Sequence, residues 1–198
     1  MTDAVELSDV KIFAEPHKGT RGGPSDRSAT GPAGAGGALV ELGHLPQEGG
    51  TYLLAPGGDL TALPLARAAE LPAVVVRVAG ARQGAVDVGA LAAFDVRGRA
   101  VLLHTGARDG RPLTLAAAAW LVEHGVSLVG TDADGLDDGS RDGAPALDAL
   151  LDAGVPVVER LTGLDALPPT GALFTAAPPR LAGVGRVPVR AFARVTRV

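Results

Sequence analysis

Apolar and polar residues follow one another in two regimes along this chain. From residue 59 onward, apolar stripes with helical spacing alternate with short runs of β-branched residues. Such alternation is typical of an α/β domain. Residues 15–50 show neither period and are dense in Gly, Pro, Ser and Thr, so we predict a Gly/Pro-rich loop region there. No internal repeat is visible, and we expect residues 1–198 to form a single domain.

The apolar runs and stripes predict individual strands and helices. Strands buried on both faces are predicted where branched apolar residues are consecutive, at residues 73–79, 100–104, 126–130 and 155–158. Helices are predicted over residues 64–71, 87–94, 115–124 and 145–153, with Asp87 and Thr114 as N-caps. In helix 115–124 one apolar stripe consists of Leu115, Ala118, Ala119 and Val122. Residues 187–195 alternate apolar and polar side chains, which predicts one strand with a single solvent-facing side.

Composition narrows the chemistry that this chain can carry. The absence of Cys excludes disulfides, thiol nucleophiles, thiolate zinc sites and iron–sulfur clusters. A metal site must therefore use carboxylates and the four histidines, His17, His44, His104 and His124. A net charge of −4 and 3% aromatic residues argue against nucleic-acid binding. No apolar run reaches the roughly 18 residues of a membrane span, and the first residues do not resemble a signal peptide, so we expect a cytoplasmic protein without membrane partners.

Polar residues that follow the predicted strands are the first candidates for a site, because ligands of α/β proteins gather beyond the carboxyl ends of strands. His104 ends one strand, and there a structural role is as reasonable as a functional one. The aspartates among residues 132–138 are best explained as solvated turn residues. Glu159 stands out because it directly follows a buried strand, where a carboxylate loses its hydration unless a positive group meets it. A local surface salt bridge is the alternative explanation for Glu159.

Several short segments carry recognisable motifs. Residues 17–23 read His-Lys-Gly-Thr-Arg-Gly-Gly, residues 100–106 form a strand ending in Thr-Gly, and residues 116–132 form a helix-strand-Gly-x-Asp unit that is followed by Asp137. Residues 150–161 contain Leu-Leu-x-x-Gly and then Val-Glu-x-Leu. Together with the closing segment 188–191, these residues resemble the metal-dependent cyclase and kynurenine formamidase-like hydrolase family. The resemblance runs from about residue 16 to the C-terminus.

The resemblance implies a fold, an oligomeric state and a reaction. The fold is a cyclase-like α/β fold of the swivelling β/β/α type, in a homodimer or a higher homo-oligomer. The usual reaction is hydrolysis of a small amide, such as the formyl amide of formylkynurenine, and some relatives act as cyclases in polyketide pathways of secondary metabolism. Zinc or manganese activates water and polarises the carbonyl group. Its ligands are both His and the Asp of a first motif, His-x-Gly-Thr-His-x-Asp, together with a helix His and a strand Glu.

This chain departs from that ligand set. His17 and Glu159 match two of the five ligand positions, whereas Arg21 and Gly23 stand where the second His and the Asp belong. The helix position, twelve residues before the Glu, is Leu147. Two ligands cannot define a zinc or manganese site of useful affinity. We therefore expect that the family's usual metal is lost.

An arginine can supply the positive charge that the metal would have supplied. A further family His, a proposed acid/base, falls near Arg27 in this chain. Without a dication, Glu159 is an unpaired buried carboxylate, which is costly. Arg21 or Arg27 can pair with such a carboxylate through two hydrogen bonds. We predict that Arg21 and Glu159 form this pair at the vacated metal position.

Three functions from different classes are compatible with these residues. The first is a metal-independent cyclase, isomerase or lyase acting on a small carbonyl or polyketide-like metabolite. In it, Arg21 or Arg27 stabilises an enolate or oxyanion, and His17 or Glu159 moves protons. The second is a non-catalytic homologue that binds a ligand or partners an active paralogue. The third is the ordinary metal-dependent amide hydrolase, arylformamidase-like, with zinc or manganese ligands from other positions.

Overall fold

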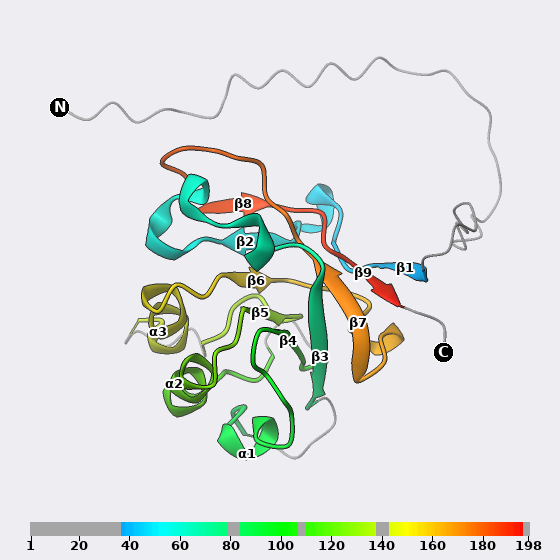
Figure 1. Cartoon of the computed structure of the whole chain (residues 1–198), viewed down its shortest axis with the longest axis vertical. Helices are drawn as coiled ribbons and strands as arrows, with labels where there is room; N and C mark the ends of the chain where they lie inside the picture. Colours follow the sequence, from blue (N-terminus) through cyan, green and yellow to red (C-terminus); the bar gives the residue numbers. More distant parts are fainter. Residues whose placement is uncertain (1–36, 79–83, 107–109, 138–142, 196–198) are drawn as a thin grey trace. The chain divides into compact units, whose positions relative to one another are not determined.

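The computed structural model describes residues 37–78, 84–106, 110–137 and 143–195. These residues form a nine-stranded mixed sheet with the strand order β1-β9-β7-β3-β4-β5-β6-β2-β8, and helices pack against it (Figure 1). The predicted α/β class is therefore confirmed.

Four parallel strands form the centre of the sheet. They are β3 (Leu71–Arg77), β4 (Ala100–His104), β5 (Leu128–Thr131) and β6 (Val157–Glu159). Every residue of β5 and β6 is buried, which explains why these segments are apolar at consecutive positions. The four predicted buried strands are thus confirmed, with ends shifted by up to two residues.

Antiparallel strands extend the sheet on both sides of this centre. Beyond β3 lie β7 (Thr170–Thr175), β9 (Phe192–Val195) and β1 (Ala38–Glu41), and beyond β6 lie β2 (Tyr52–Leu54) and β8 (Arg186–Pro188). The residue after β1 then contacts the segment after β6. Here Leu42 donates its N–H to the carbonyl of Ala191 at 2.8 Å and accepts from the N–H of Thr162 at 2.9 Å. Because Leu42 follows one edge strand and Thr162 follows β6, the sheet curls into a half-barrel.

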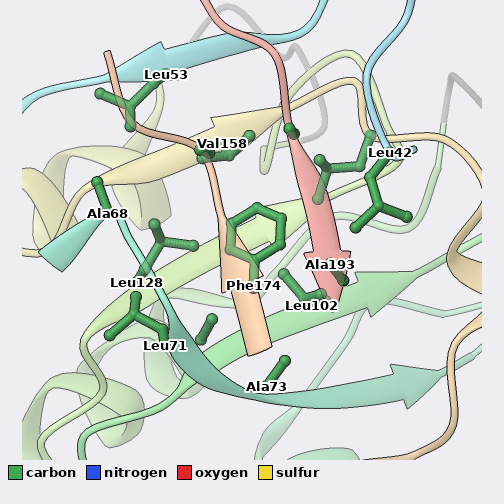
Figure 2. Close-up of a cluster of buried hydrophobic side chains, with 14 of the residues drawn as sticks. Leu42, Leu53, Ala68, Leu71, Ala73, Leu102, Leu128, Val158, Phe174 and Ala193 are labelled. Atoms are coloured by element: carbon green, nitrogen blue, oxygen red, sulfur yellow. The ribbon is translucent and has the colours of Figure 1, made fainter. Parts of the chain in front are cut away.

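Each face of the sheet carries its own apolar core. The face enclosed by the curl packs around Phe174, whose ring lies among Val158, Leu102 and Ala193 (Figure 2). The opposite face is covered by α1 (Val88–Leu91), α2 (Leu115–Glu123) and α3 (Pro145–Asp152) (Figure 1). The connections contain the 3-10 helices Pro46–Glu48, Pro56–Gly58, Leu60–Ala62, Leu65–Arg67 and Leu164–Ala166. Within the described residues, no helix has the length and apolar character that crossing a bilayer requires.

Two helix starts are confirmed by their capping hydrogen bonds. The Asp87 carboxylate accepts from the N–H of Ala90 at 3.1 Å at the start of α1. The Thr114 hydroxyl accepts from the N–H of Ala117 at 3.1 Å at the start of α2. These side chains satisfy N–H groups that have no partner inside the first turn.

The helix predicted over residues 64–71 is wrong. Only the 3-10 turn Leu65–Arg67 forms, and β3 already begins at Leu71. Glu70 has a φ of 52°, a left-handed conformation that a right-handed helix cannot contain. Ala68 accepts a hydrogen bond of 2.8 Å from the N–H of Ala176, which follows β7. Pairing with this distant segment outweighs the helix propensity of the Ala-rich sequence.

The apolar stripe predicted for α2 is also wrong in part. The buried residues are Ala117, Ala118 and Leu121, whereas the side chain of Leu115 is 53% exposed. Nearly every residue of this helix is apolar, so spacing alone does not identify the face that meets the sheet. The face is instead chosen by packing of the larger Leu121 into the core.

Strands differ from the prediction in two chain segments. Residues 38–41, inside the predicted loop region 15–50, form β1 because they pair with β9. The alternation in residues 187–195 is confirmed, since Val187, Val189, Ala191 and Ala193 are buried. It belongs to two strands rather than one, because β8 pairs with β2 while β9 pairs with β7 and β1.

Candidate functional site

Glu159 is a buried carboxylate at the end of β6. Only 5% of the residue is exposed. Val158 points into the core enclosed by the curl, so Glu159, next along the strand, points to the face that carries the helices. Burial raises the pKa of Glu159 above its ordinary value, and the nearby Arg186 guanidinium opposes part of this rise.

A guanidinium group meets this carboxylate from a neighbouring part of the sheet. Arg186 Nη2 donates to Glu159 Oε2 at 3.2 Å. The guanidinium carbon also lies 4.0 Å from the centre of the Tyr52 ring, a cation–π contact. Both contacts arise because β2 lies between β6 and β8, which places Tyr52 opposite Glu159. A positive group thus meets Glu159, in a salt bridge whose arginine is half-exposed and is neither of the predicted arginines, Arg21 and Arg27.

The next residue, Arg160, ties several loops to the end of β6. Its φ is 60°, an uncommon conformation for a residue with a side chain. Its guanidinium pairs with Asp134 Oδ1 at 2.9 Å and donates to the carbonyls of Gly50 and Glu48 at 3.2 and 3.3 Å. Its own carbonyl accepts from the Thr51 hydroxyl at 2.6 Å. These contacts hold the strand end, and with it Glu159, in one position.

A second polar cluster lies at the ends of β4 and β5. The Asp132 carboxylate accepts from the N–H and the hydroxyl of Thr105 and from the N–H of Gly106, at 2.6–3.1 Å. His104 Nε2 lies 3.9 Å from Asp132 Oδ2, and His104 Nδ1 is buried without a hydrogen-bond partner in the described part of the chain. The prediction of a solvated turn residue is wrong for Asp132, because this carboxylate is largely buried and holds the turn after β4.

Asp137 has a structural role as well. Its carboxylate oxygens accept from the N–H groups of Ala146 and Leu147, at 2.9 and 3.0 Å. These N–H groups belong to the first turn of α3, so Asp137 caps this helix from a distant loop. Asp138 lies outside the described residues.

The described residues do not fit the metal centre that the resemblance implies. Leu147, at the helix ligand position, has no metal-binding atom in its side chain. Glu159 Oε2 already accepts a hydrogen bond from Arg186. Among residues 37–78, 84–106, 110–137 and 143–195, no three His, Cys, Asp or Glu side chains converge as ligands. In this part of the chain the charge of Glu159 is therefore balanced by a guanidinium group.

Three of the four predicted site residues lie outside the described residues, namely His17, Arg21 and Arg27. The Arg21–Glu159 pair thus stays a prediction. His44 has a structural place, since its N–H donates to the Thr51 hydroxyl at 2.9 Å.

Sequence reasoning missed Arg186, Tyr52 and Arg160. Arg186 is 27 residues from Glu159 along the chain and reaches it only because two short strands pair with β2. The signal for Arg186 in the sequence is indirect, because a buried Glu159 requires a nearby cation but does not say which one. No pattern in the sequence marks Arg160, because its contacts depend on the carbonyl groups of a separate loop.

The fold matches known structures. Isatin hydrolase A from Labrenzia aggregata, bound to benzyl benzoate, is 22% identical with a TM-score of 0.64, over 75% of this chain and 73% of that chain. An isatin hydrolase bound to the product analogue thioisatinate is 20% identical with a TM-score of 0.66, over 75% and 72%. A potential metal-dependent hydrolase with cyclase activity is 18% identical with a TM-score of 0.64, over 79% and 97%. These matches confirm the predicted cyclase-like α/β fold of the swivelling β/β/α type.

The sequence also matches a family. A comparison with curated protein sequences gives no significant match. Residues 9–138, more than half of the chain, match the family model described as "Putative cyclase". This range includes the Thr-Gly strand end at residues 100–106 and the helix-strand unit at residues 116–132. The chain therefore belongs to the cyclase family.

Proposed function

We propose that this chain is a metal-independent enzyme: a cyclase, isomerase or lyase that acts on a small carbonyl or polyketide-like metabolite. Family membership, with hydrolases and a cyclase among the structural neighbours, supports an enzyme of this broad class. The proposal that no metal is needed is based on the Arg186–Glu159 pair. Here a guanidinium group supplies the positive charge that an ion would supply to this carboxylate in a metal-dependent relative.

The chemistry proposed for this pair is proton transfer next to a carbonyl group. Burial raises the pKa of Glu159, which makes its carboxylate a stronger base than an ordinary one and suits it to accept and return a proton. Glu159 takes the proton from the carbon beside the carbonyl, the electrons of that C–H bond form a C=C bond, and the carbonyl π electrons move to the oxygen, which gives an enolate. Arg186 stabilises the negative charge on this oxygen. In an isomerase, Glu159 returns the proton to another carbon. In a lyase, the enolate electrons re-form the carbonyl group, a new C=C bond forms as the bond from the neighbouring carbon to the leaving group breaks, and Glu159 gives the proton to the departing group.

Residues of the first motif complete the proposal. We propose that His17 acts as a second proton-transfer group and that Arg21 or Arg27 adds positive charge beside the enolate. These three roles rest on the resemblance of residues 17–23 to the family motif. Substitution of each residue by Ala, with folding checked by circular dichroism, tests them individually.

The decisive experiment combines metal analysis with turnover. The full chain is purified with and without a chelator, its zinc and manganese contents are measured, and it is assayed on a panel of small carbonyl compounds and on formylkynurenine. We expect substoichiometric metal and a reaction that survives the chelator. Glu159→Gln should abolish that reaction, whereas Glu41→Gln, which changes an exposed carboxylate in a similar pair with Arg190, should not.

Two other outcomes correspond to the alternative functions. Stoichiometric zinc or manganese, with formylkynurenine hydrolysis that the chelator stops, would identify a metal-dependent amide hydrolase. Absence of turnover throughout the panel, together with thermal stabilisation by some of its compounds, would identify a non-catalytic ligand-binding homologue. Either result would contradict the proposed function.

A further inference from the structure

The guanidinium group of Arg186 is held in place by two contacts on different sides. The Tyr52 ring lies beneath it at 4.0 Å, and Glu159 Oε2 accepts from Nη2 at 3.2 Å. The backbone of Arg186 is fixed by pairing of β8 with β2, in which Arg186 stands opposite Leu54. A side chain so restrained loses little further conformational freedom when it binds a ligand.

The same guanidinium group still has donors to offer. An arginine has five N–H donors in a planar fork, and among the described residues only Nη2 of Arg186 has a hydrogen-bond partner. Its side chain is 49% exposed, so the remaining donors can reach a molecule from solution. Arg160, by comparison, is 17% exposed and its guanidinium is occupied by Asp134 and two carbonyl groups. Arg186 is thus a restrained cation with unused donors beside the proposed proton-transfer group.

We infer that Arg186 binds the carboxylate group of a small-molecule substrate through the unused edge of its guanidinium fork. A planar carboxylate accepts two parallel N–H bonds from such a fork, which fixes both its position and its orientation. The inference rests on the proposed function for the chemistry at Glu159, and it narrows the substrate class to carbonyl compounds that also carry a carboxylate group.

The local charges favour a singly charged carboxylate over a phosphate. Arg186 donates to the Glu159 carboxylate, whereas the nearby Asp134 is paired with Arg160. A ligand at Arg186 therefore lies beside the Glu159 carboxylate, which repels a dianion about twice as strongly as a monoanion. The Tyr52 ring adds an apolar surface next to the guanidinium group.

The test is a binding titration of the full chain with benzoate, followed by NMR of the arginine side-chain N–H groups. Benzamide, which has the same shape without the charge, serves as the matched ligand, and inorganic phosphate as the competing anion. We expect benzoate to bind, benzamide not to bind, and phosphate to bind more weakly than benzoate. Benzamide binding as well as benzoate, or phosphate binding more tightly, would overturn the inference.

Three variants locate the binding site. Arg186→Gln should raise the Kd of benzoate about tenfold or more, the usual effect of losing hydrogen bonds to a charged partner. Arg186→Lys keeps the charge that compensates Glu159 but lacks the planar fork, so this variant should also weaken benzoate binding. It tests the binding site even if Arg186→Gln does not fold. Arg190→Gln, which changes an 82% exposed arginine on the same segment, should leave the Kd unchanged. Equal affinities in the native chain and Arg186→Lys would disprove the inference.

Failure of this inference and failure of the proposed function give different results. If benzoate binds at Arg186 but Glu159→Gln keeps full turnover, the carboxylate site stands and the proposed function is wrong. If Glu159→Gln abolishes turnover while substitutions at Arg186 leave benzoate binding unchanged, the proposed function stands and the carboxylate site is wrong.

Discussion

At the scale of single residues, the main feature of the molecule is the incomplete compensation of one buried charge. Glu159 is 5% exposed, yet its partner Arg186 is half-exposed and contacts one carboxylate oxygen only. Removing Arg186 leaves the buried Glu159 charge without compensation, which is costly, whereas removing the Glu159 charge leaves an arginine that water can reach. The pair that affects the stability of the fold is therefore also the pair to which we assign the proposed chemistry.

Arg186→Met tests this dependence. We expect the free energy of unfolding at pH 7 to fall by about 1–2 kcal/mol, less than for a fully buried pair because water screens the half-exposed arginine. Urea denaturation monitored by circular dichroism measures the change. Arg190→Met is the control, because the Arg190–Glu41 pair is exposed on both sides and its loss should leave stability essentially unchanged. Equal effects of the two substitutions would contradict a special role for Arg186.

The pH dependence of stability follows from the pKa of Glu159, which burial raises above the ordinary value of 4.5. Between 4.5 and the raised value, the folded state binds more protons than the unfolded state. The contribution of Glu159 to the free energy of unfolding is therefore fully present below pH 4.5 and is lost as the pH rises through the folded pKa.

Glu159→Gln should remove this contribution. Urea denaturation between about pH 4 and pH 8 should show a smaller loss of stability with rising pH in the variant than in the native chain. At pH 7 the variant should be at least as stable as the native chain, because it buries no charge. Identical pH profiles would show that the carboxyl group is not desolvated in the folded protein.

At the scale of elements, local signals in the sequence identified helix starts and buried strands but not the partners of each element. Thr114 and Asp87 cap α2 and α1 as predicted, because an N-cap acts within one turn of its own helix. The cap of α3 was not predicted, since Asp137 reaches the helix from a separate loop. The predicted helix at residues 64–71 failed for the same reason, because its backbone pairs with a segment after β7.

Asp137→Ala tests the role of the α3 cap. The substitution leaves two N–H groups of the first turn without their acceptor, so we expect a loss of about 1 kcal/mol in the free energy of unfolding. Asp137→Asn keeps one acceptor oxygen and should lose less. Hydrogen exchange should become faster at Ala146 and Leu147 in Asp137→Ala. Unchanged exchange at these two positions would contradict the capping role.

At the scale of the whole molecule, the curl of the sheet brings the parts of the site together. Residues after β1 meet residues after β6, and the three strands β6, β2 and β8 lie side by side although β2 precedes β6 by about a hundred residues. The core enclosed by this curl contains Phe174 from β7 and Leu53 from β2, on opposite sides of the sheet centre (Figure 2). Packing in this core therefore supports the position of Arg186 and Glu159.

The predicted homo-oligomer stays a prediction, and light scattering on the full chain would determine the number of subunits.

Phe174→Ala tests the contribution of the enclosed core. Phe174 is fully buried, so its truncation should lower the free energy of unfolding by about 3–5 kcal/mol. Phe94→Ala, which changes a partly buried ring on the helix-covered face, should cost clearly less. Urea denaturation measures both. A larger loss for Phe94→Ala than for Phe174→Ala would show that the curl does not depend on this core.

Local patterns in the sequence suffice for the α/β class, the four buried strands, two helix caps and the position of Glu159 at the end of a buried strand. Each of these depends on consecutive residues or on one turn of helix, and such short-range patterns can be read directly from the chain. Other features become visible only in the folded chain: Arg186 pairs with Glu159 and stacks on Tyr52, Asp137 caps α3, and residues 187–195 divide between two strands. These contacts join residues far apart in the sequence through strand pairing and loop packing, and no spacing along the chain encodes which strands pair.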